Sequence, residues 1–485
     1  MRKMIRAEWF AVLAGLSILV YSLFTEPFIG VADNGDFLRV MGTVGLNYGL
    51  PDESYEDRFF GYAHRYFSYD RFFQGFYPST QIILVAAARL IGSVRDPSSF
   101  DIRVLGALFS VLLLAATYII VRYNTYKSSA VGVALAICML FVFFDIGYAA
   151  YFNSLFGEPV SFVFLLLSAG FGLCLLNREK PSRTIIWLYF VSVFFLACSK
   201  IQNAPAGILF AALGLRFMTL RHEPNWRRLT IGLSASIAVV SVVMYAAAPK
   251  GLKNINLYQT VFYGILHGSP DIDGDLKELG LPSHLSVLAG TNYFQTDTAI
   301  KQDAPSMKPD FYDRVSHRDI LLFYVKHPSR LIDKMEFAAS NSMSIRPYYL
   351  GNYLKQENKP SGAMAYGYSV WSEFKHTQMP RSLLFISAFY AIYYAVAIFE
   401  YIRRRDRISR IRTELMMLIG LVGAIGFLMP ILGDGQADIG KHLFLFNVCF
   451  DMMLVVSVIW LVYQLAHWSA RASGRAGGDA RAVRS

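Results

Sequence analysis

Long apolar runs recur along the chain, and short polar segments separate them. Each run is close to the length that an α-helix needs to cross about 30 Å of hydrocarbon. A β-barrel would instead show segments of about ten residues with alternating polarity, and the chain has no such alternation. The pattern predicts an all-α polytopic membrane protein with about ten transmembrane helices, near residues 8–28, 101–121, 129–147, 160–176, 184–199, 204–220, 229–248, 382–402, 413–432 and 442–465.

The connections between these runs differ in charge, and this difference predicts their sides. Arginine and lysine gather in alternate connections, most densely at residues 403–412, and the two chain ends fall on the same side. The positive-inside rule puts that side, with both termini, in the cytoplasm, as in a multi-pass protein of a cell inner (plasma) membrane. The long connections at residues 29–100 and 249–381 are then extracytoplasmic. The first run lacks a small-residue cleavage pattern, so we expect it to be retained as a span.

Residues 77–92 (YPSTQIILVAAARLIG) are apolar but short for a span. Counting them would move the arginine-rich connections to the outer face, so we expect an interfacial helix in the first outer loop. Helical periodicity at residues 317–340 predicts a folded appendage in the second outer loop, between spans seven and eight. The expected organisation is a transmembrane module (1–250, with the first outer loop at 29–100), a large outer loop (251–381), C-terminal spans (382–465) and a disordered basic cytoplasmic tail (466–485).

Composition agrees with lipid as the solvent. Of 485 residues, 54% are hydrophobic, which is too apolar for one water-soluble core. The net charge of +11 comes from residues beside apolar runs and forms no extended basic face, so we expect no nucleic-acid partner. The cysteines lie in or at the ends of predicted spans and indicate neither a disulfide framework nor a zinc site; they are Cys138, Cys174, Cys198 and Cys449.

Polar side chains gather in connections predicted to share the outer face. Taken singly, each has a structural explanation: a helix cap with a local ion pair for Asp36 and Arg39, a cap for Glu158, and snorkelling for Lys200. Taken together, they lie in loops too short to diverge far, which predicts one pocket. The segments are ADNGDFLR (32–39), YFNSLFGEP (151–159), SKIQNAP (199–205) and GDGQADIGKH (433–442).

This grouping suits transfer of a group from a lipid phosphate. One carboxylate takes a proton from an incoming hydroxyl, and cations stabilise the departing phosphate. Deeper in the last span, Asp451 should have a partner, because an unpaired charge there would cost ~2.5–3.5 kcal/mol.

The layout resembles that of the GT-C superfamily of integral membrane glycosyltransferases. The strings NGDF (34–37), YFNS (151–154) and GEP (157–159) are similar to those of bacterial hexose transferases of surface-glycan and S-layer glycan assembly. The resemblance covers about residues 1–250. It implies an inverting hexosyltransferase that uses a polyprenyl-phosphate sugar donor and a glycan or lipid acceptor, among membrane lipids, on the extracytoplasmic face.

Carried onto this sequence, the resemblance implies that Asp36 is the base for the acceptor hydroxyl, with Asp33 as the alternative, and that Glu158 orients the acceptor or a metal. These three carboxylates would hold a divalent cation only if they converge, so the metal and cofactor stay open. The candidates for binding substrate are Arg39, Asn153, Lys200, Gln202, Asn203, Arg346, Lys441 and His442.

Two other functions remain open. A transporter or a flippase for lipid-linked sugars would also use charged and aromatic pockets, but the chain shows neither paired halves nor many midplane charges. A phosphotransferase or ligase acting on the same lipid carriers would form a product that retains phosphate.

Overall fold

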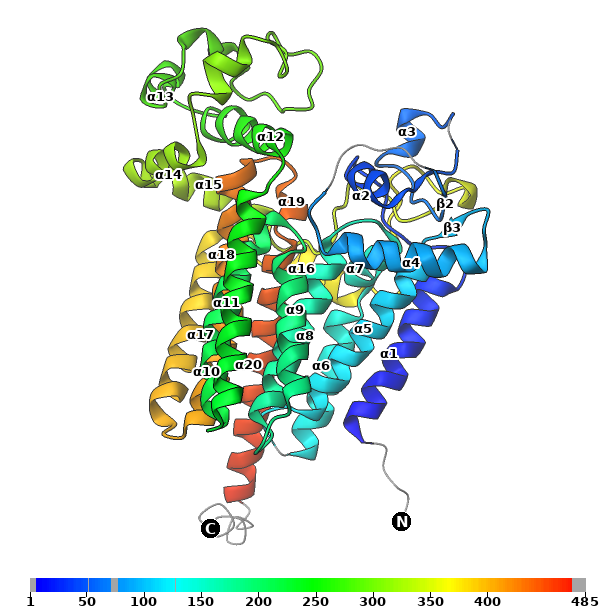
Figure 1. Cartoon of the computed structure of the whole chain (residues 1–485), viewed down its shortest axis with the longest axis vertical. Coiled ribbons are helices and arrows are strands. Elements are labelled where there is room, and N and C mark those ends of the chain that lie inside the picture. Colours follow the sequence, from blue (N-terminus) through cyan, green and yellow to red (C-terminus); the bar gives the residue numbers. More distant parts are fainter. Residues whose placement is uncertain (1–5, 51, 71–76, 127, 473–485) are drawn as a thin grey trace.

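The computed structural model describes residues 6–50, 52–70, 77–126 and 128–472. Its long helices form an upright bundle, and smaller elements gather at one end of it, the loop-bearing end (Figure 1). Every predicted apolar run coincides with a helix of the bundle. These helices are α1 (Ala7–Phe24), α5 (Arg103–Arg122), α6 (Ser129–Phe143), α8 (Glu158–Leu176), α9 (Arg183–Ala197), α10 (Ala204–Arg216), α11 (Pro224–Ala246), α17 (Leu383–Arg403), α18 (Arg407–Asp434) and α20 (Phe444–Ala472).

The described helices make this an all-α polytopic membrane protein, as predicted. Eight of them are long and apolar enough to cross a membrane. A ninth span is formed if α6 is counted together with the segment that follows it, α7 (Ile146–Ala149) and η1 (Ala150–Asn153), across the 55° bend between them. The tenth predicted run is α9, which is apolar but has 15 residues and packs between α8 and α10. That length is short of the roughly 20 residues that cross hydrocarbon unaided.

The arginine-rich connections meet at the end of the bundle opposite the loops. Arg178 donates to the Tyr123 hydroxyl at 2.7 Å, and Arg412 donates to Asn177 at 3.3 Å, so three of the basic connections touch. The start of α1 and the end of α20 lie at the same end (Figure 1). The alternation of basic connections along the sequence therefore corresponds to two distinct ends of the bundle.

The first long connection folds as a small cap on the loop-bearing end. Within it, α4 lies across the bundle (Figure 1) and exposes Ile83, Leu90 and Val94, as expected of an interfacial helix. The sequence pattern did not indicate the small antiparallel sheet, whose strands are only two or three residues long. The elements are α2 (Phe37–Val44), β1 (Asn47–Tyr48), α3 (Tyr55–Arg58), β2 (Tyr66–Ser68), α4 (Gln81–Arg95) and β3 (Phe100–Asp101).

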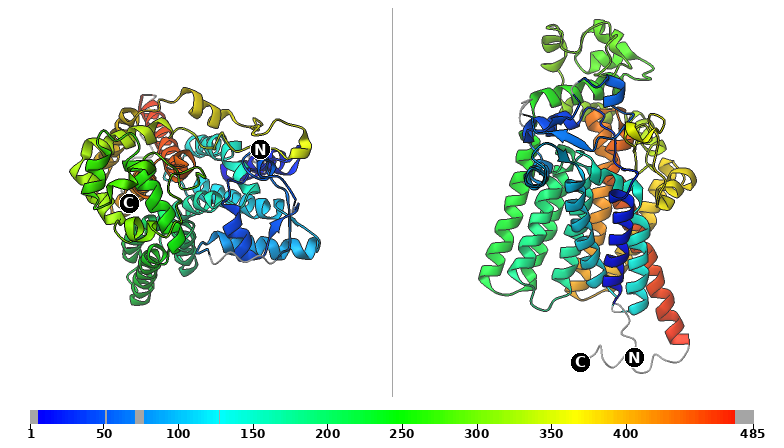
Figure 2. Two further views of the ribbon diagram at one scale, coloured as in Figure 1. Left: turned by 90° about the horizontal axis from the view of Figure 1, so that it is seen from above. Right: turned by 90° about the vertical axis from the view of Figure 1, so that its right-hand side faces the viewer.

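The second long connection begins as a separate folded unit. The predicted periodicity at residues 317–340 is confirmed by α14 and α15, and a capping box of Ser316 and Asp319 begins α14. The unit has its own apolar core and projects from the loop-bearing end of the bundle (Figure 2), where α12, α14 and α15 contact α18. Its elements are α12 (Lys250–Thr260), η4 (Val261–Ile265), α13 (Ile272–Glu278), η5 (Ser283–Leu288), η6 (Lys308–Tyr312), α14 (His317–Lys326) and α15 (Pro328–Ser340).

The remainder of the second connection, with η7 (Lys355–Glu357) and α16 (Val370–Gln378), is joined to the rest of the protein. Asn352 accepts the backbone N–H of Gly30 at 3.0 Å, which links the two outer loops. From α16, the Lys375 ammonium lies 2.5 Å from the Asp451 carboxylate, and both side chains are fully buried. This confirms the expected partner for Asp451. Only the part of the loop up to α15 is therefore an appendage.

The predicted start of the tail at residue 466 is wrong. The last helix, α20, continues to Ala472, because apolar and aromatic residues persist through that stretch. The rest of the predicted tail, residues 473–485, lies outside the described residues.

Candidate functional site

Asp33 shapes the turn that leads into α2. One of its oxygens accepts the backbone N–H groups of Gly35 (2.8 Å) and Phe37 (3.1 Å), and the other accepts the Tyr48 hydroxyl. The side chain is fully buried. Burial raises the pKa of Asp33 to about 6, against the hydrogen bond from Tyr48, which lowers it. Asp33 therefore fixes the backbone and has no face open to a substrate.

Asp36 immediately precedes α2 and reaches the surface, with 31% of its side chain exposed. One of its oxygens pairs with Arg39, one turn along α2, and the other lies 2.5 Å from the Lys441 ammonium. Burial favours the neutral acid, but the charges of Lys441 and Arg39 together outweigh it and hold the pKa of Asp36 well below its usual range. Asp36 is thus an ionised, partly accessible carboxylate between two cations.

Lys441 lies at the centre of the site, in α19 (Ile439–His442), with 1% of its side chain exposed. Its ammonium is also 3.1 Å from Asp438 and lies over the Phe156 ring at 4.7 Å from the ring centre. Burial opposes the charge, but Asp36, Asp438 and Glu158 raise the pKa of Lys441 well above its usual value. The buried ammonium is therefore fully charged.

The connection between α18 and α20 holds Lys441 in place. The Asp438 carboxylate accepts a hydrogen bond from the side-chain amide of Asn34 at 3.1 Å and another from the Tyr349 hydroxyl in the second loop. His442 pairs with Asp434 at 2.9 Å, and Gln202 donates to the His442 backbone carbonyl at 3.4 Å. The segment 433–442 is thereby tied to both outer loops and to the connection before α10.

Glu158 begins α8, with Pro159 in the first turn as the sequence suggested. One Glu158 oxygen lies 2.5 Å from the Lys200 ammonium, and the other is buried with no hydrogen-bond partner among the described residues. Lys200 also acts electrostatically on Asp36, as Glu158 does on Lys441. The structure thus brings the four polar connections into one cluster, called here the ionic cluster: Asp36, Arg39, Glu158, Lys200, Asp434, Asp438, Lys441 and His442.

Two of the amides predicted to bind substrate serve the fold instead. Asn153 is buried and donates to two backbone carbonyls near the end of α1, at 2.8 and 3.1 Å. Asn203 is buried and donates to the hydroxyls of Ser161 and Ser199, at 2.8 and 2.9 Å. Each orders the backbone around the ionic cluster and presents no exposed group to a ligand.

Arg346 lies in a different network. It pairs with Glu373 of α16 at 2.5 Å and donates to the Ala365 carbonyl, and none of its described contacts is with the ionic cluster. Tyr77, which was not singled out from sequence, does belong near the cluster. The guanidinium of Arg39 lies over its ring at 5.9 Å, and burial raises the pKa of Tyr77 to about 12.

The three candidate carboxylates do not form a metal site by themselves. Among the described residues, no three His, Cys, Asp or Glu side chains are grouped so that they could hold a metal ion. Asp33 is directed at Tyr48, while Asp36 and Glu158 are paired with cationic side chains. A divalent ion would have to displace those cations before it could bind.

The comparisons with known proteins give one match. Residues 1–478 match the family model of the YfdI N-terminal transmembrane domain, so the match includes every described helix. No curated protein and no solved structure matches the chain.

Proposed function

The chain belongs to the family of the YfdI N-terminal transmembrane domain, and from that premise we propose that it is a membrane glycosyltransferase of GT-C type. It transfers a hexose-type sugar from a polyprenyl-phosphate donor to a glycan or envelope acceptor, with inversion at the anomeric carbon. The active site is the ionic cluster, on the extracytoplasmic face of the inner membrane, and both termini are cytoplasmic.

The observation that carries this proposal is the position of Asp36 between Arg39 and Lys441. Transfer from a lipid phosphate needs a base for the acceptor hydroxyl and positive charge for the leaving phosphate. Asp36 can serve as the base, and Arg39, one turn along α2, and the buried Lys441 supply the positive charge. The apolar outer face of α4 lies at the same end of the bundle, where the donor's lipid chain can rest.

The resting ion pairs suggest how the donor prepares the site. In the free protein both oxygens of Asp36 are held by cations, which makes its carboxylate a weak base. A donor phosphate competes for Arg39 and Lys441, so the pKa of Asp36 rises when the donor binds. The base is therefore strengthened only in the complex that can react.

The chemical step then balances as a single displacement. The acceptor oxygen attacks the anomeric carbon and its proton passes to Asp36. The bond from that carbon to the phosphate oxygen breaks, and polyprenyl phosphate leaves with the bonding electron pair. Arg39 and Lys441 stabilise the negative charge on the leaving group, and Lys200 adds to the positive field that acts on Asp36. Glu158, whose side chain is buried, positions the Lys200 ammonium within the cluster.

The test measures transfer of labelled sugar from a panel of polyprenyl-phosphate hexoses in proteoliposomes. Asp36→Asn should lower transfer by about 10²–10⁴-fold, the usual contribution of a general base. Asp52→Asn is the matched control, because Asp52 is an exposed acid in the same loop. Full transfer by a correctly inserted Asp36→Asn protein would remove the catalytic assignment.

The same experiment separates the alternatives. If the wild type transfers nothing while labelled lipid changes leaflet, the protein is a flippase and its acids line a path. If the product retains the donor's phosphate, the reaction is phosphotransfer. Glu158→Gln should reduce transfer less than Asp36→Asn does, because its role is to position and not to accept the proton.

A further inference from the structure

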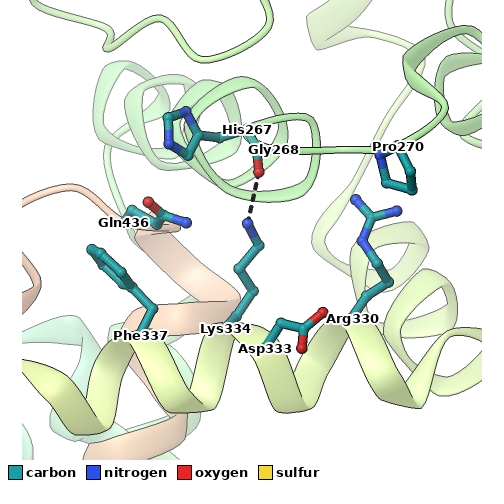
Figure 3. Close-up of a pocket in the computed structure, with 8 residues that line it drawn as sticks. All are labelled: His267, Gly268, Pro270, Arg330, Asp333, Lys334, Phe337 and Gln436. Carbon is teal, nitrogen blue, oxygen red and sulfur yellow. Dashed lines mark hydrogen bonds between the residues drawn. The ribbon is translucent and has the colours of Figure 1, made fainter.

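A pocket of about 410 Å³ lies outside the ionic cluster, between α15 and the turn at residues 267–270. Figure 3 shows Arg330, Lys334 and Phe337 on the face of α15 that points to this turn, with Gln436 at one end. Spacings of three and four residues put these three side chains on one helix face. The pocket is therefore lined by one face of α15, by a turn of the appendage and by one residue of the α18–α19 connection.

Part of the lining is rigid. Arg330 lies 3.1 Å from Asp275 and donates to the Ile265 carbonyl at 2.6 Å. Lys334 donates to the His267 carbonyl at 2.9 Å, which uses one of its three N–H bonds. These contacts fix both cationic side chains before any ligand arrives.

Other hydrogen-bonding groups in the lining are unused. Asp333, Gln436 and the His267 ring have no hydrogen-bond partner among the described residues, and Lys334 retains two N–H bonds. The lining thus offers both donors and acceptors. Phe337, which is 36% exposed, adds an aromatic surface beside them.

This combination selects among ligand classes. A phosphate would use only the donors and would be repelled by Asp333. A hydrocarbon would leave the Asp333 carboxylate and two N–H bonds of Lys334 desolvated without partners. A sugar has hydroxyl groups that donate and accept, and an apolar C–H face that can lie on Phe337. The volume of about 410 Å³ lies within the roughly 300–1,000 Å³ typical of small-molecule pockets and accommodates a hexose ring.

The pocket is connected to the ionic cluster through the chain itself. Gln436 lies two residues after Asp434 and two before Asp438, which pair with His442 and Lys441. We propose that this pocket is a carbohydrate-binding subsite that holds a sugar unit of the acceptor glycan while another unit of the same glycan reaches Asp36. The acceptor role rests on the proposed function, whereas sugar binding itself does not.

Sugar binding is tested first, by saturation-transfer NMR on the purified full-length protein in detergent. The probes are the methyl glycosides of glucose, galactose and rhamnose. The wild type should show saturation transfer from at least one of them. Gln436→Ala and Phe337→Ala should weaken that signal by about tenfold, the loss expected for one or two ligand contacts. Lys308→Gln, at an exposed lysine with no described side-chain contact, should leave it unchanged.

The outcomes separate the two proposals. Glycoside signals that are absent, or equal in the wild type and both pocket variants, would refute the subsite. Binding of inorganic phosphate without any glycoside would refute it as well. Asp36→Asn should keep full binding, because Asp36 lies outside the pocket. In the transfer assay, Gln436→Ala should raise KM for the acceptor about tenfold and leave KM for the donor unchanged. Glycoside binding without any transfer would refute the glycosyltransferase and leave the sugar site standing.

Discussion

Replacing Lys441 by methionine should move the acid limb of activity toward neutral pH. Lys441 is the nearest cation to Asp36 that comes from a distant part of the chain, and it holds the Asp36 carboxylate in its ionised form. Methionine keeps the length and apolar stem of lysine but removes the charge. Without that charge, Asp36 binds a proton at higher pH, so the fraction of enzyme with a usable base falls sooner as pH is lowered.

The size of the effect follows from the distance. Two unit charges 2.5 Å apart interact by ~1.7 kcal/mol even at the dielectric constant of water, which equals about 1.2 pKa units. Because about two thirds of the Asp36 side chain is buried, the effective dielectric constant is lower and this value is a lower limit. The pH profile of kcat/KM reports the free enzyme, so the apparent pKa of its acid limb should increase by at least about one unit.

Two measurements check this prediction. One is the pH profile of kcat/KM for sugar transfer by the wild type and by Lys441→Met. The other does not depend on activity: labelling of Asp36 with a carbodiimide and an amine, followed by mass spectrometry across the same pH range. Lys308→Met is the matched control, since it removes an exposed lysine with no described side-chain contact. An unchanged Asp36 titration in Lys441→Met, or one moved to lower pH, would refute the reasoning.

Three further predictions follow from other contacts. Lys375→Met should destabilise the protein by about 3–5 kcal/mol, because Asp451 is left charged and fully buried; thermal unfolding in detergent measures this. Asp33→Asn should retain transfer activity within about tenfold and lose roughly 1 kcal/mol of stability, because Asp33 accepts structural hydrogen bonds and faces no substrate. A membrane-impermeant maleimide should label Ser306→Cys in intact cells and Ser129→Cys only after permeabilisation, because exposed Ser306 precedes η6 of the appendage and exposed Ser129 begins α6 at the opposite, basic end of the bundle.

Each of these predictions has a result that would contradict it. If Lys375→Met unfolds at the same temperature as the wild type, the buried pair contributes nothing to the docking of α16. Loss of transfer in Asp33→Asn comparable to that in Asp36→Asn would make Asp33 the base. Labelling of Ser129→Cys in intact cells would invert the topology and place the ionic cluster in the cytoplasm.

The local sequence pattern was sufficient to predict the spans, because lipid requires every helix to satisfy its own backbone hydrogen bonds and to expose apolar side chains, whatever its neighbours are. It was sufficient for α14 and α15 because the apolar period and the cap of Ser316 act within a few residues. It also indicated which segments carry the polar chemistry, since Asp36, Glu158, Lys200 and Lys441 all lie in connections singled out from sequence and all enter the ionic cluster.

Local pattern could not decide how those residues pair. Asp33 and Asp36 are three residues apart, yet one is buried against Tyr48 and the other is partly open, which depends on where β1 lies. Arg346 carries the same charge as Arg39 but pairs with α16.

By itself, the sequence determined the membrane-spanning class of the protein, the alternation of its basic connections and the segments in which polar residues collect. The tertiary structure alone decided that Asp36 meets Lys441, which lies 405 residues away in the chain, and that α16 inserts Lys375 beside Asp451. The physical reason is one of range. Hydrophobic length and helix capping act on neighbouring residues, whereas an ion pair between distant segments depends on where every intervening helix has packed.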